Sequence, residues 1–160
     1  MDKDRRYNIR KAREQEYTVS ECSFDRETLE EFYDHYEHTI ERVDGIQYPF
    51  SFFKALSEQL PESVRLYRAE VDGMVVGYHL YLFDELQSTI IHSFSGVKST
   101  NFEYYPSELI HSYIISGEYN NYNTYDFGRT IADRGDGLFK YKREYGGDVL
   151  ATPVWRRPFG

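Results

Sequence analysis

The sequence predicts a mixed α/β (α+β) fold in one domain over residues 1–160, with a mainly antiparallel sheet and helices on both faces. Two segments with helical spacing of apolar residues come first. Alternating segments around a hairpin signal follow, and helices then alternate with short strands. Such an order gives a mixed sheet, because strand–helix–strand connections place helices on its faces. About residues 1–20 form a charged lead-in with a first strand at Tyr17–Val19, and residues 21–160 form the core.

The first helix is predicted from Asp25, a good N-cap, to about Arg42, before Asp44-Gly45 ends it. Its apolar residues make one buried stripe: Leu29, Phe32, Tyr33, Tyr36 and Ile40. A second helix begins at Pro49 and stops at Pro61, because proline suits a first turn but cannot continue a helix. Its residues expected to point inward are Phe50, Phe53, Leu56 and Leu60.

A three-stranded antiparallel meander comes next. Val64–Val71 alternates in polarity, and Asp72-Gly73 is the best hairpin signal in the chain. Met74–Phe83 is the returning strand. A turn at Asp84-Glu85 leads to a third strand over Gln87–Val97.

In the last part of the chain, the sequence pattern predicts a helix, a strand, a second helix and a second strand. Pro106 opens a helix to about Gly117, with Leu109, Ile110, Tyr113 and Ile114 on one face. Asn123–Phe127 is a short strand, Gly137–Tyr145 a short helix, and Asp148–Trp155 a final strand.

Composition and charge exclude several classes of protein. The chain has 19 basic and 27 acidic residues and a net charge of −8. This charge argues against a protein that binds DNA through most of its own surface. The one cysteine, Cys22, permits no internal disulfide. The longest nearly uncharged apolar stretch, Met74–Phe83, is too short to span a membrane, and the first twenty residues carry no signal peptide. We therefore expect a cytoplasmic protein.

Basic residues gather late in the chain, and they are Arg129, Arg134, Lys140, Lys142 and Arg143. A cluster of this kind can hold a phosphate or carboxylate group. A basic surface patch without a ligand explains the same pattern nearly as well. Both interpretations stay open from the residues alone.

The predicted order of elements resembles that of the GNAT acyltransferase fold, and three local stretches sharpen the resemblance. The first holds Phe32-Tyr33, Tyr36, Thr39, Arg42, Pro49 and Phe52-Phe53. The second runs from Pro106 to Tyr125–Thr130, and the third holds Gly137–Lys140 and Tyr145-Gly146. Together they are similar to the Fem-type branch, which includes aminoacyl-tRNA-dependent peptidoglycan-bridge transferases. Members of that branch carry two GNAT-like domains in tandem, and this chain resembles the second alone.

The resemblance implies a set of site residues. It assigns Lys140, which follows the bulky Phe139, to the reaction site, where a cation stabilises the developing oxyanion. Asp126 is the second candidate catalytic residue, with a role in orienting Arg129 or Lys140, although capping a turn explains it as well. The candidate substrate-binding residues are Arg42, Tyr48, Tyr105 and Arg129, although a cation at Arg42 also suits the C-terminal dipole of its helix without any function. Gly128 permits a tight turn beside them.

We expect no metal site. His35 and His38 share a helix face with Glu31, but an exposed polar face explains these residues. The other three histidines, which are His79, His92 and His111, are scattered over two strands and a helix. A histidine near the open end of the sheet can serve as a general base, whereas a buried histidine satisfied by hydrogen bonds is the more common case.

The co-substrate is left open between acetyl-CoA and an aminoacyl-tRNA. Enzymes of the GNAT fold that use acetyl-CoA cradle its pyrophosphate with a glycine-rich turn after the fourth strand. The corresponding segment, residues 96–106, contains a single glycine, Gly96. This argues against acetyl-CoA as the donor.

Three functions follow from these observations. The first is transfer of an acyl or aminoacyl group onto an amine of a small-molecule or peptidyl cell-envelope precursor. The second is acetyl-CoA-dependent N-acetylation, and the third is a non-catalytic binding half of a two-domain protein. The expected protein partner is a preceding GNAT-like domain or a second copy of the chain.

Overall fold

The computed structural model describes residues 1–117, 119, 121–130 and 135–151. The chain divides into two compact units. Tyr7–Arg129 forms one unit and contains the whole sheet. Met1–Arg6 and residues 130–160 form the other.

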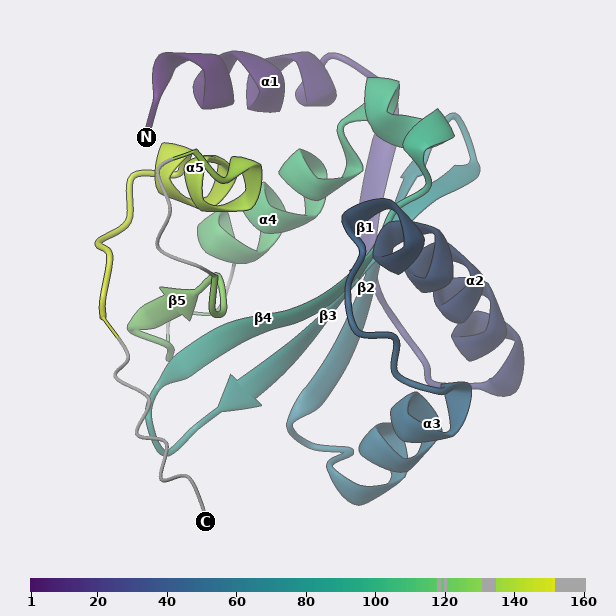
Figure 1. Ribbon diagram of the computed structural model, residues 1–160. Coiled ribbons are helices and arrows are strands. Elements are labelled where there is room, and N and C mark those ends of the chain that lie inside the picture. The colour runs from purple at the N-terminus through teal and green to yellow at the C-terminus, as the bar shows by residue number, and fades with distance from the viewer. Residues whose placement is uncertain (118, 120, 131–134, 152–160) are drawn as a thin grey trace, which may run out of the picture. The chain divides into compact units, whose positions relative to one another are not determined.

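One sheet of five strands runs in the order β1-β2-β3-β4-β5 (Figure 1). The strands are β1 (Tyr17–Cys22), β2 (Val64–Val71), β3 (Met74–Asp84), β4 (Thr89–Gly96) and β5 (Thr124–Asp126). The helices are α1 (Lys3–Arg13), α2 (Arg26–Val43), α3 (Phe50–Gln59), the 3₁₀ helix η1 (Ser99–Tyr104), α4 (Pro106–Ser116) and α5 (Gly137–Glu144). Strands β1 to β4 pair antiparallel, and β5 pairs parallel to β4. The predicted mixed, mainly antiparallel sheet is confirmed.

The β2–β3 hairpin turns at the dipeptide that the sequence indicates. Asp72 and Gly73 have φ angles of 51° and 75°. Two successive positive φ angles match the twist of the flanking strands, which is why Asp-Gly is favoured there. Val71 consequently pairs with Met74, and both strands begin and end within a residue of their predicted bounds.

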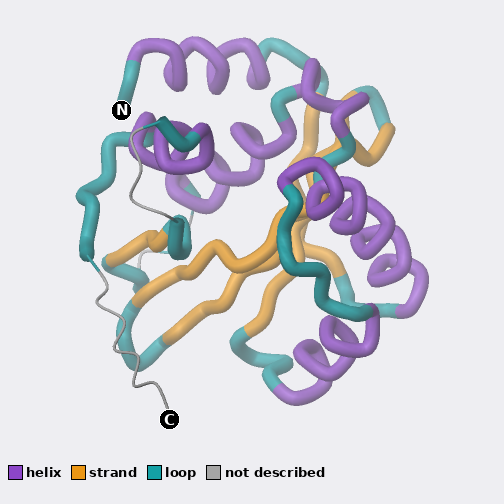
Figure 2. Tube along the Cα trace, in the orientation of Figure 1, coloured by secondary structure: helices purple, strands orange, loops and turns teal. Residues whose placement is uncertain are grey.

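Helices α2 and α3 cover one face of the sheet (Figure 2). The carboxylate of Asp25 accepts a hydrogen bond from the Thr28 N–H and caps α2, and Asp44 ends it in the left-handed conformation. The buried side chains of this layer are mostly aromatic and aliphatic, and they are Leu29, Phe32, Tyr36, Phe53, Val64, Leu66, Tyr78 and Leu80. Rings here meet edge to face, which adds stability beyond burial alone.

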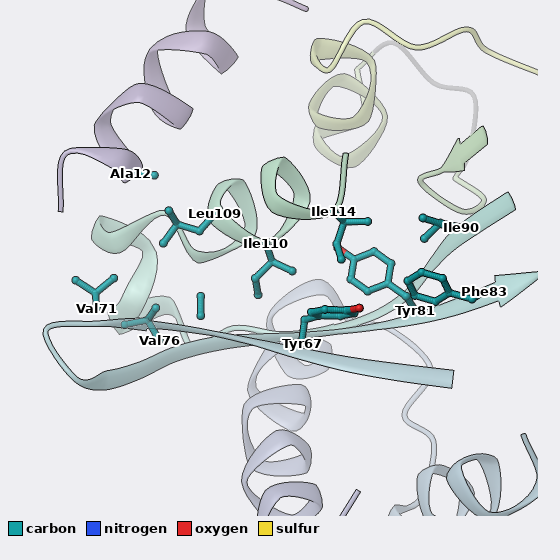
Figure 3. Close-up of a cluster of buried hydrophobic side chains, with 11 residues drawn as sticks. Ala12, Tyr67, Val71, Val76, Tyr81, Phe83, Ile90, Leu109, Ile110 and Ile114 are labelled. Atoms are coloured by element: carbon teal, nitrogen blue, oxygen red, sulfur yellow. The ribbon is translucent and has the colours of Figure 1, made fainter. Parts of the chain in front are cut away.

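Helix α4 covers the opposite face. Figure 3 shows Leu109, Ile110 and Ile114 of α4 above the strand residues, with Ala12 of α1 beside them. The strands contribute Tyr67, Ala69, Val71, Val76, Tyr81, Phe83 and Ile90 to this cluster. The expected cover of helices on both faces of the sheet is confirmed.

Four details differ from the sequence expectations. The charged lead-in is a helix, α1, because Arg5, Ile9 and Ala12 recur at helical spacing and are buried. Leu60 and Tyr113, which we expected to point inward, are 43% and 41% exposed. Residues 148–151 form no strand, and their side chains Val149 and Leu150 are 59% and 87% exposed. The rest of the expected final strand, residues 152–155, lies outside the described residues.

A buried cation, Arg5, contributes to the packing of the smaller unit. The Arg5 guanidinium lies 2.8 Å from the Glu144 carboxylate and 4.1 Å from the centre of the Tyr141 ring. Asp136 caps α5 by accepting a hydrogen bond from the Phe139 N–H. A search of the described residues for a helix long and apolar enough to cross a lipid bilayer finds none.

Candidate active site

Strand β4 runs past the end of β5, and this leaves one of its edges open. β5 pairs with β4 only over Thr89–Ile91, whereas β3 accompanies β4 to Gly96. In the part of the chain that the structure describes, no strand pairs with residues 92–96 on the β5 side. We call residues 92–96 on that side the open edge of β4. A strand edge of this kind can hydrogen-bond an extended ligand through its main chain.

A tight turn follows β5, and its Phe127 ring lies 5.3 Å from the His111 ring, centre to centre. The Asp126 carboxylate accepts a hydrogen bond of 2.7 Å from the Gly128 N–H. Gly128 has a φ of 73°, a conformation that costs glycine little. The turn-capping interpretation of Asp126 and the tight turn expected at Gly128 agree with this geometry.

Three histidines from three elements converge beside the open edge. His79 lies on β3, His92 is the first residue of β4 beyond its pairing with β5, and His111 lies on α4. Their ring centres are 4.5–4.7 Å apart. We call this group the histidine cluster. Its potential ligand nitrogens all lie within 4.8 Å of one another.

A β-bulge brings His92 to the α4 face of the sheet. Leu80 pairs with Phe94, but the next residue, Tyr81, pairs with His92, so Ser93 is the extra residue on β4. Because side chains alternate between faces, this shift places His92 opposite Tyr81 rather than in the aromatic layer under α2.

Hydroxyl groups hold the histidine rings. The Ser107 hydroxyl lies 3.1 Å from Nε2 of His79. The Tyr125 hydroxyl lies 2.5 Å from Nδ1 of His111, and the Tyr81 hydroxyl lies 3.1 Å from the same nitrogen. Hydroxyls both donate and accept, so they can satisfy either tautomer of an imidazole.

Burial keeps His79 uncharged near neutral pH. His79 and His111 are each 1% exposed. Burial lowers the pKa of His79 well below its ordinary value, and positive charge on His92 would lower it further. Neutral imidazoles can accept a proton or bind a transition metal ion.

Helix α2, rather than a neighbouring strand, fixes the far end of β4. The buried hydroxyl of Thr39 accepts a hydrogen bond of 2.8 Å from the Val97 N–H and donates to the Val97 carbonyl at 3.1 Å. A Cβ at Gly96 would lie 2.9 Å from Cβ of His35 and from N of Tyr36, so only glycine allows this close approach. Gly96 therefore serves helix packing.

The segment after β4 is helical. η1 is tied to the sheet by the Asn101 side-chain amide, which donates to the Val76 carbonyl at 3.0 Å. The Lys98 ammonium lies 2.5 Å from the Asp34 carboxylate, which holds the pKa of Asp34 below its usual value. Tyr105 then takes a left-handed φ of 53°, and Pro106, which has no N–H, opens α4. The expected lack of a glycine-rich loop agrees with this path.

A recess of about 340 Å³ adjoins the site on the β5 side. It lies between β5 and the end of α4, and Tyr125 both lines it and contacts His111. Its other lining residues are Ile90, Ile114, Ile115, Gly117, Tyr119, Tyr122, Asn123 and Thr124.

The structure brings only some of the predicted site residues near the open edge. Asp126 ends β5 and is exposed, and the exposed Arg129 follows its turn. Tyr105 joins η1 to α4 two residues before Ser107, which contacts the histidine cluster. Arg134 lies outside the described residues.

The remaining predicted residues have other surroundings, although Tyr48 also lies 5.6 Å, ring centre to ring centre, from Phe94 of β4. The Arg42 guanidinium lies 4.9 Å from the centre of the Phe102 ring, at the end of α2. Tyr48 is 40% exposed, and the centre of its ring lies 4.6 Å from the centre of the Phe52 ring in the aromatic layer under α2 and α3. Lys140 is an exposed residue of α5 and belongs to the smaller unit.

Sequence reasoning missed the convergence of the three histidines. Spacings of 13 and 19 residues match no metal-binding or catalytic motif. The available signal was a combination: His79 and Tyr81 alternate on one face of a strand, and His111 falls on the apolar face of a helix. The bulge that turns His92 into the same layer had no signal in the sequence.

Comparison with known proteins places this fold in a family. The model of a family described as the acetyltransferase (GNAT) domain matches residues 3–143. The chain therefore belongs to the GNAT acetyltransferase family, and its sheet with helices on both faces is a GNAT fold. A search of curated proteins found no match.

Solved structures share this fold at low sequence identity. A crystal structure of FemX superposes with a TM-score of 0.76 at 14% identity, over 91% of this chain and 54% of FemX. The chain thus spans about half the length of FemX. A possible acetyltransferase from Clostridium difficile 630 gives a TM-score of 0.62 at 10% identity, over 89% of this chain and 97% of that one. An aminoglycoside N-acetyltransferase in complex with CoA gives a TM-score of 0.54 at 9% identity, over 90% of this chain and 95% of that one.

Proposed function

We propose that the chain is a cytoplasmic acyltransferase of the Fem-type branch that moves an acyl or aminoacyl group onto an amine of a cell-envelope or peptide precursor. The observation that carries this proposal is the open edge of β4. An extended donor or peptidyl acceptor can pair with the main chain there, as a further strand would. Family membership and the fold shared with FemX support the class of reaction.

The proposed reaction is a direct attack by an amine. The neutral nitrogen of the acceptor forms a C–N bond with the donor's carbonyl carbon, and negative charge develops on the carbonyl oxygen. The C–O or C–S bond of the donor then breaks, and the departing oxygen or sulfur takes the proton that the amine loses. Main-chain N–H groups of the open edge are suited to the developing oxyanion, because such donors need no reorganisation during the reaction.

Lys140 keeps the role that the family resemblance implies, and Asp126 keeps the orienting role expected from its place at a strand end. Lys140 would stabilise the oxyanion, and its exposed position on α5 leaves its ammonium accessible to a substrate. Asp126 would orient Arg129 through the turn that it caps. The proposed substrate contacts are Arg42, Tyr48, Tyr105 and Arg129.

We further propose that the chain corresponds to the second of two GNAT-like domains and works with a preceding domain or a second copy. The supporting observation is that it spans 54% of FemX, with a TM-score of 0.76. The acceptor would then be held where the two domains meet, as the resemblance implies.

Acetyl-CoA-dependent N-acetylation is the second candidate function. It is supported by the fold shared with a possible acetyltransferase and with an aminoglycoside N-acetyltransferase in complex with CoA, of which the alignment covers 97% and 95%. The helical segment after β4 argues against it, because η1 and Pro106 stand where a glycine-rich loop would present N–H groups to pyrophosphate.

A donor screen on the full chain separates these functions. Acetyl-CoA and a set of aminoacyl-tRNAs are each offered with a lysine-containing envelope peptide, and the product is identified by mass spectrometry. Transfer from aminoacyl-tRNA supports the Fem-type function, and transfer from acetyl-CoA supports the second candidate. No transfer from either donor, even with a preceding GNAT-like domain added, would support a non-catalytic binding half.

The lysine is tested in the same assay. Lys140→Ala should leave the fold intact and reduce transfer at least tenfold. Lys54→Ala is the matched control, since Lys54 is also an exposed helical lysine and pairs with Glu58 of its own helix. Equal activity of the Lys140→Ala and Lys54→Ala variants would remove Lys140 from the mechanism.

A further inference from the structure

We infer that the histidine cluster is a zinc site in which His79, His92 and His111 are the ligands. This inference goes beyond the proposed function and does not depend on it. In the part of the chain that the structure describes, this is the one group of three metal-ligating side chains close enough to share an ion. The three ligands come from β3, β4 and α4, so a bound ion would join the sheet to the helix above it.

The distances suit a small ion. Two nitrogen ligands at about 2.0–2.1 Å from a tetrahedral zinc ion lie about 3.4 Å apart. The ligand atoms here lie within 4.8 Å of one another, so small ring rotations bring them to that separation. Three imidazoles leave one position of a tetrahedral ion for a water molecule.

The surrounding hydroxyls match the outer shell of a metal site. A ligating histidine usually has its second ring nitrogen held by a hydrogen-bonding group, which fixes the tautomer and the ring orientation. Ser107 occupies this place at His79, and Tyr125 and Tyr81 share it at His111. The ligating nitrogen of His79 would be Nδ1, which lies 3.4 Å from the Tyr81 hydroxyl, so that hydroxyl would give way to the ion. Each hydroxyl oxygen can accept the ring N–H that remains when the other nitrogen binds a metal ion.

The type and burial of the donors also suit a transition metal ion. His79 and His111 are almost fully buried imidazoles, and imidazole nitrogen is a preferred ligand of zinc. Imidazole donors suit zinc and its neighbours in the first transition row better than magnesium or calcium. We expect Zn²⁺, with Co²⁺ as its spectroscopic substitute.

Cobalt titration of the full chain, after treatment with a chelator, tests the site. We expect one equivalent of Co²⁺ to bind with the strong visible absorption of four-coordinate cobalt, and one equivalent of Zn²⁺ to abolish that absorption. The melting temperature of the chain should rise on zinc addition. His92→Gln and His111→Gln should each weaken cobalt binding at least a hundredfold.

Two further variants separate ligation from general metal binding. His38→Gln is the matched control, because His38 is an exposed histidine on α2, 3.9 Å from Asp34. It should leave the stoichiometry and the spectrum unchanged. Tyr125→Phe keeps all three ligands and removes one outer-shell hydroxyl, so it should weaken binding about 10–100-fold. This variant also tests the site if His92→Gln or His111→Gln fails to fold.

The inference is overturned if no equivalent binds, if bound cobalt shows only the weak absorption of a six-coordinate ion, or if His38→Gln removes binding while His92→Gln does not. Because no readout uses transfer activity, a failed donor screen leaves this result unaffected. In the same way, a missing metal site would leave the acyltransferase proposal standing.

Discussion

Replacing Gly96 with alanine tests how β4 is held against α2. The added Cβ would lie 2.9 Å from Cβ of His35 and from the Tyr36 nitrogen, and 3.1 Å from the His35 carbonyl carbon. Ordinary contacts of this kind begin near 3.4 Å. Two of the three neighbours are backbone atoms of α2, so no side-chain rotation relieves the contact. Overpacking costs about 1–3 kcal/mol, and we expect Gly96→Ala to destabilise the chain by about 2–3 kcal/mol.

The assay is chemical denaturation followed by circular dichroism, together with hydrogen exchange of residues 89–97. Hydrogen exchange reports the opening of β4 itself, whichever unit of the chain unfolds first. The control is Gly137→Ala, since a Cβ at Gly137 meets nothing within 4 Å. That variant should stay within about 0.5 kcal/mol of the wild type. If Gly96→Ala were as stable as Gly137→Ala, and β4 exchange were unchanged, the close approach of α2 to β4 would be wrong.

Three further predictions concern buried polar groups and helix caps. Thr39→Val removes the hydroxyl that satisfies both main-chain groups of Val97, and denaturation should show a loss of about 1–3 kcal/mol; an unchanged midpoint would contradict that bond. His79 is buried as the neutral form, and in the unfolded chain its pKa is about 6.5. The unfolded chain therefore binds more protons in acid, and stability should fall as the pH drops below about 6.5. With chelator present, the melting temperature should fall less between pH 7 and pH 5 in His79→Gln than in the wild type, and parallel curves would refute this. Asp136→Ala removes the cap bond to the Phe139 N–H, so α5 should lose about 1 kcal/mol and its amides should exchange faster, whereas Asp136→Asn should not change them.

Local signals in the sequence were enough to predict most of the fold. Asp25 caps α2 through its own side chain, Asp72-Gly73 makes the hairpin turn, and Pro106 opens α4. Each of these features depends on residues close together in the chain. The N-terminal helix was missed because its buried stripe includes a charged residue, Arg5, whose partner Glu144 lies at the other end of the sequence.

The site was harder to predict because it depends on contacts between distant residues. The turn at Asp126 followed from the sequence, since the side chain caps a turn that ends two residues later. The meeting of His79, His92 and His111 did not, because it requires the register of β3 and β4 and the extra residue at Ser93. Sequence position alone also gave no indication that Tyr48 belongs to the aromatic layer. The role of Lys140 stays a prediction.

The end of β4 takes its place from α2, through the buried Thr39 hydroxyl and the absent side chain of Gly96. A change on the inner side of that helix can therefore tilt the open edge without altering any group that touches a substrate. Selection on substrate preference could act through such remote positions and leave the residues that line the edge untouched.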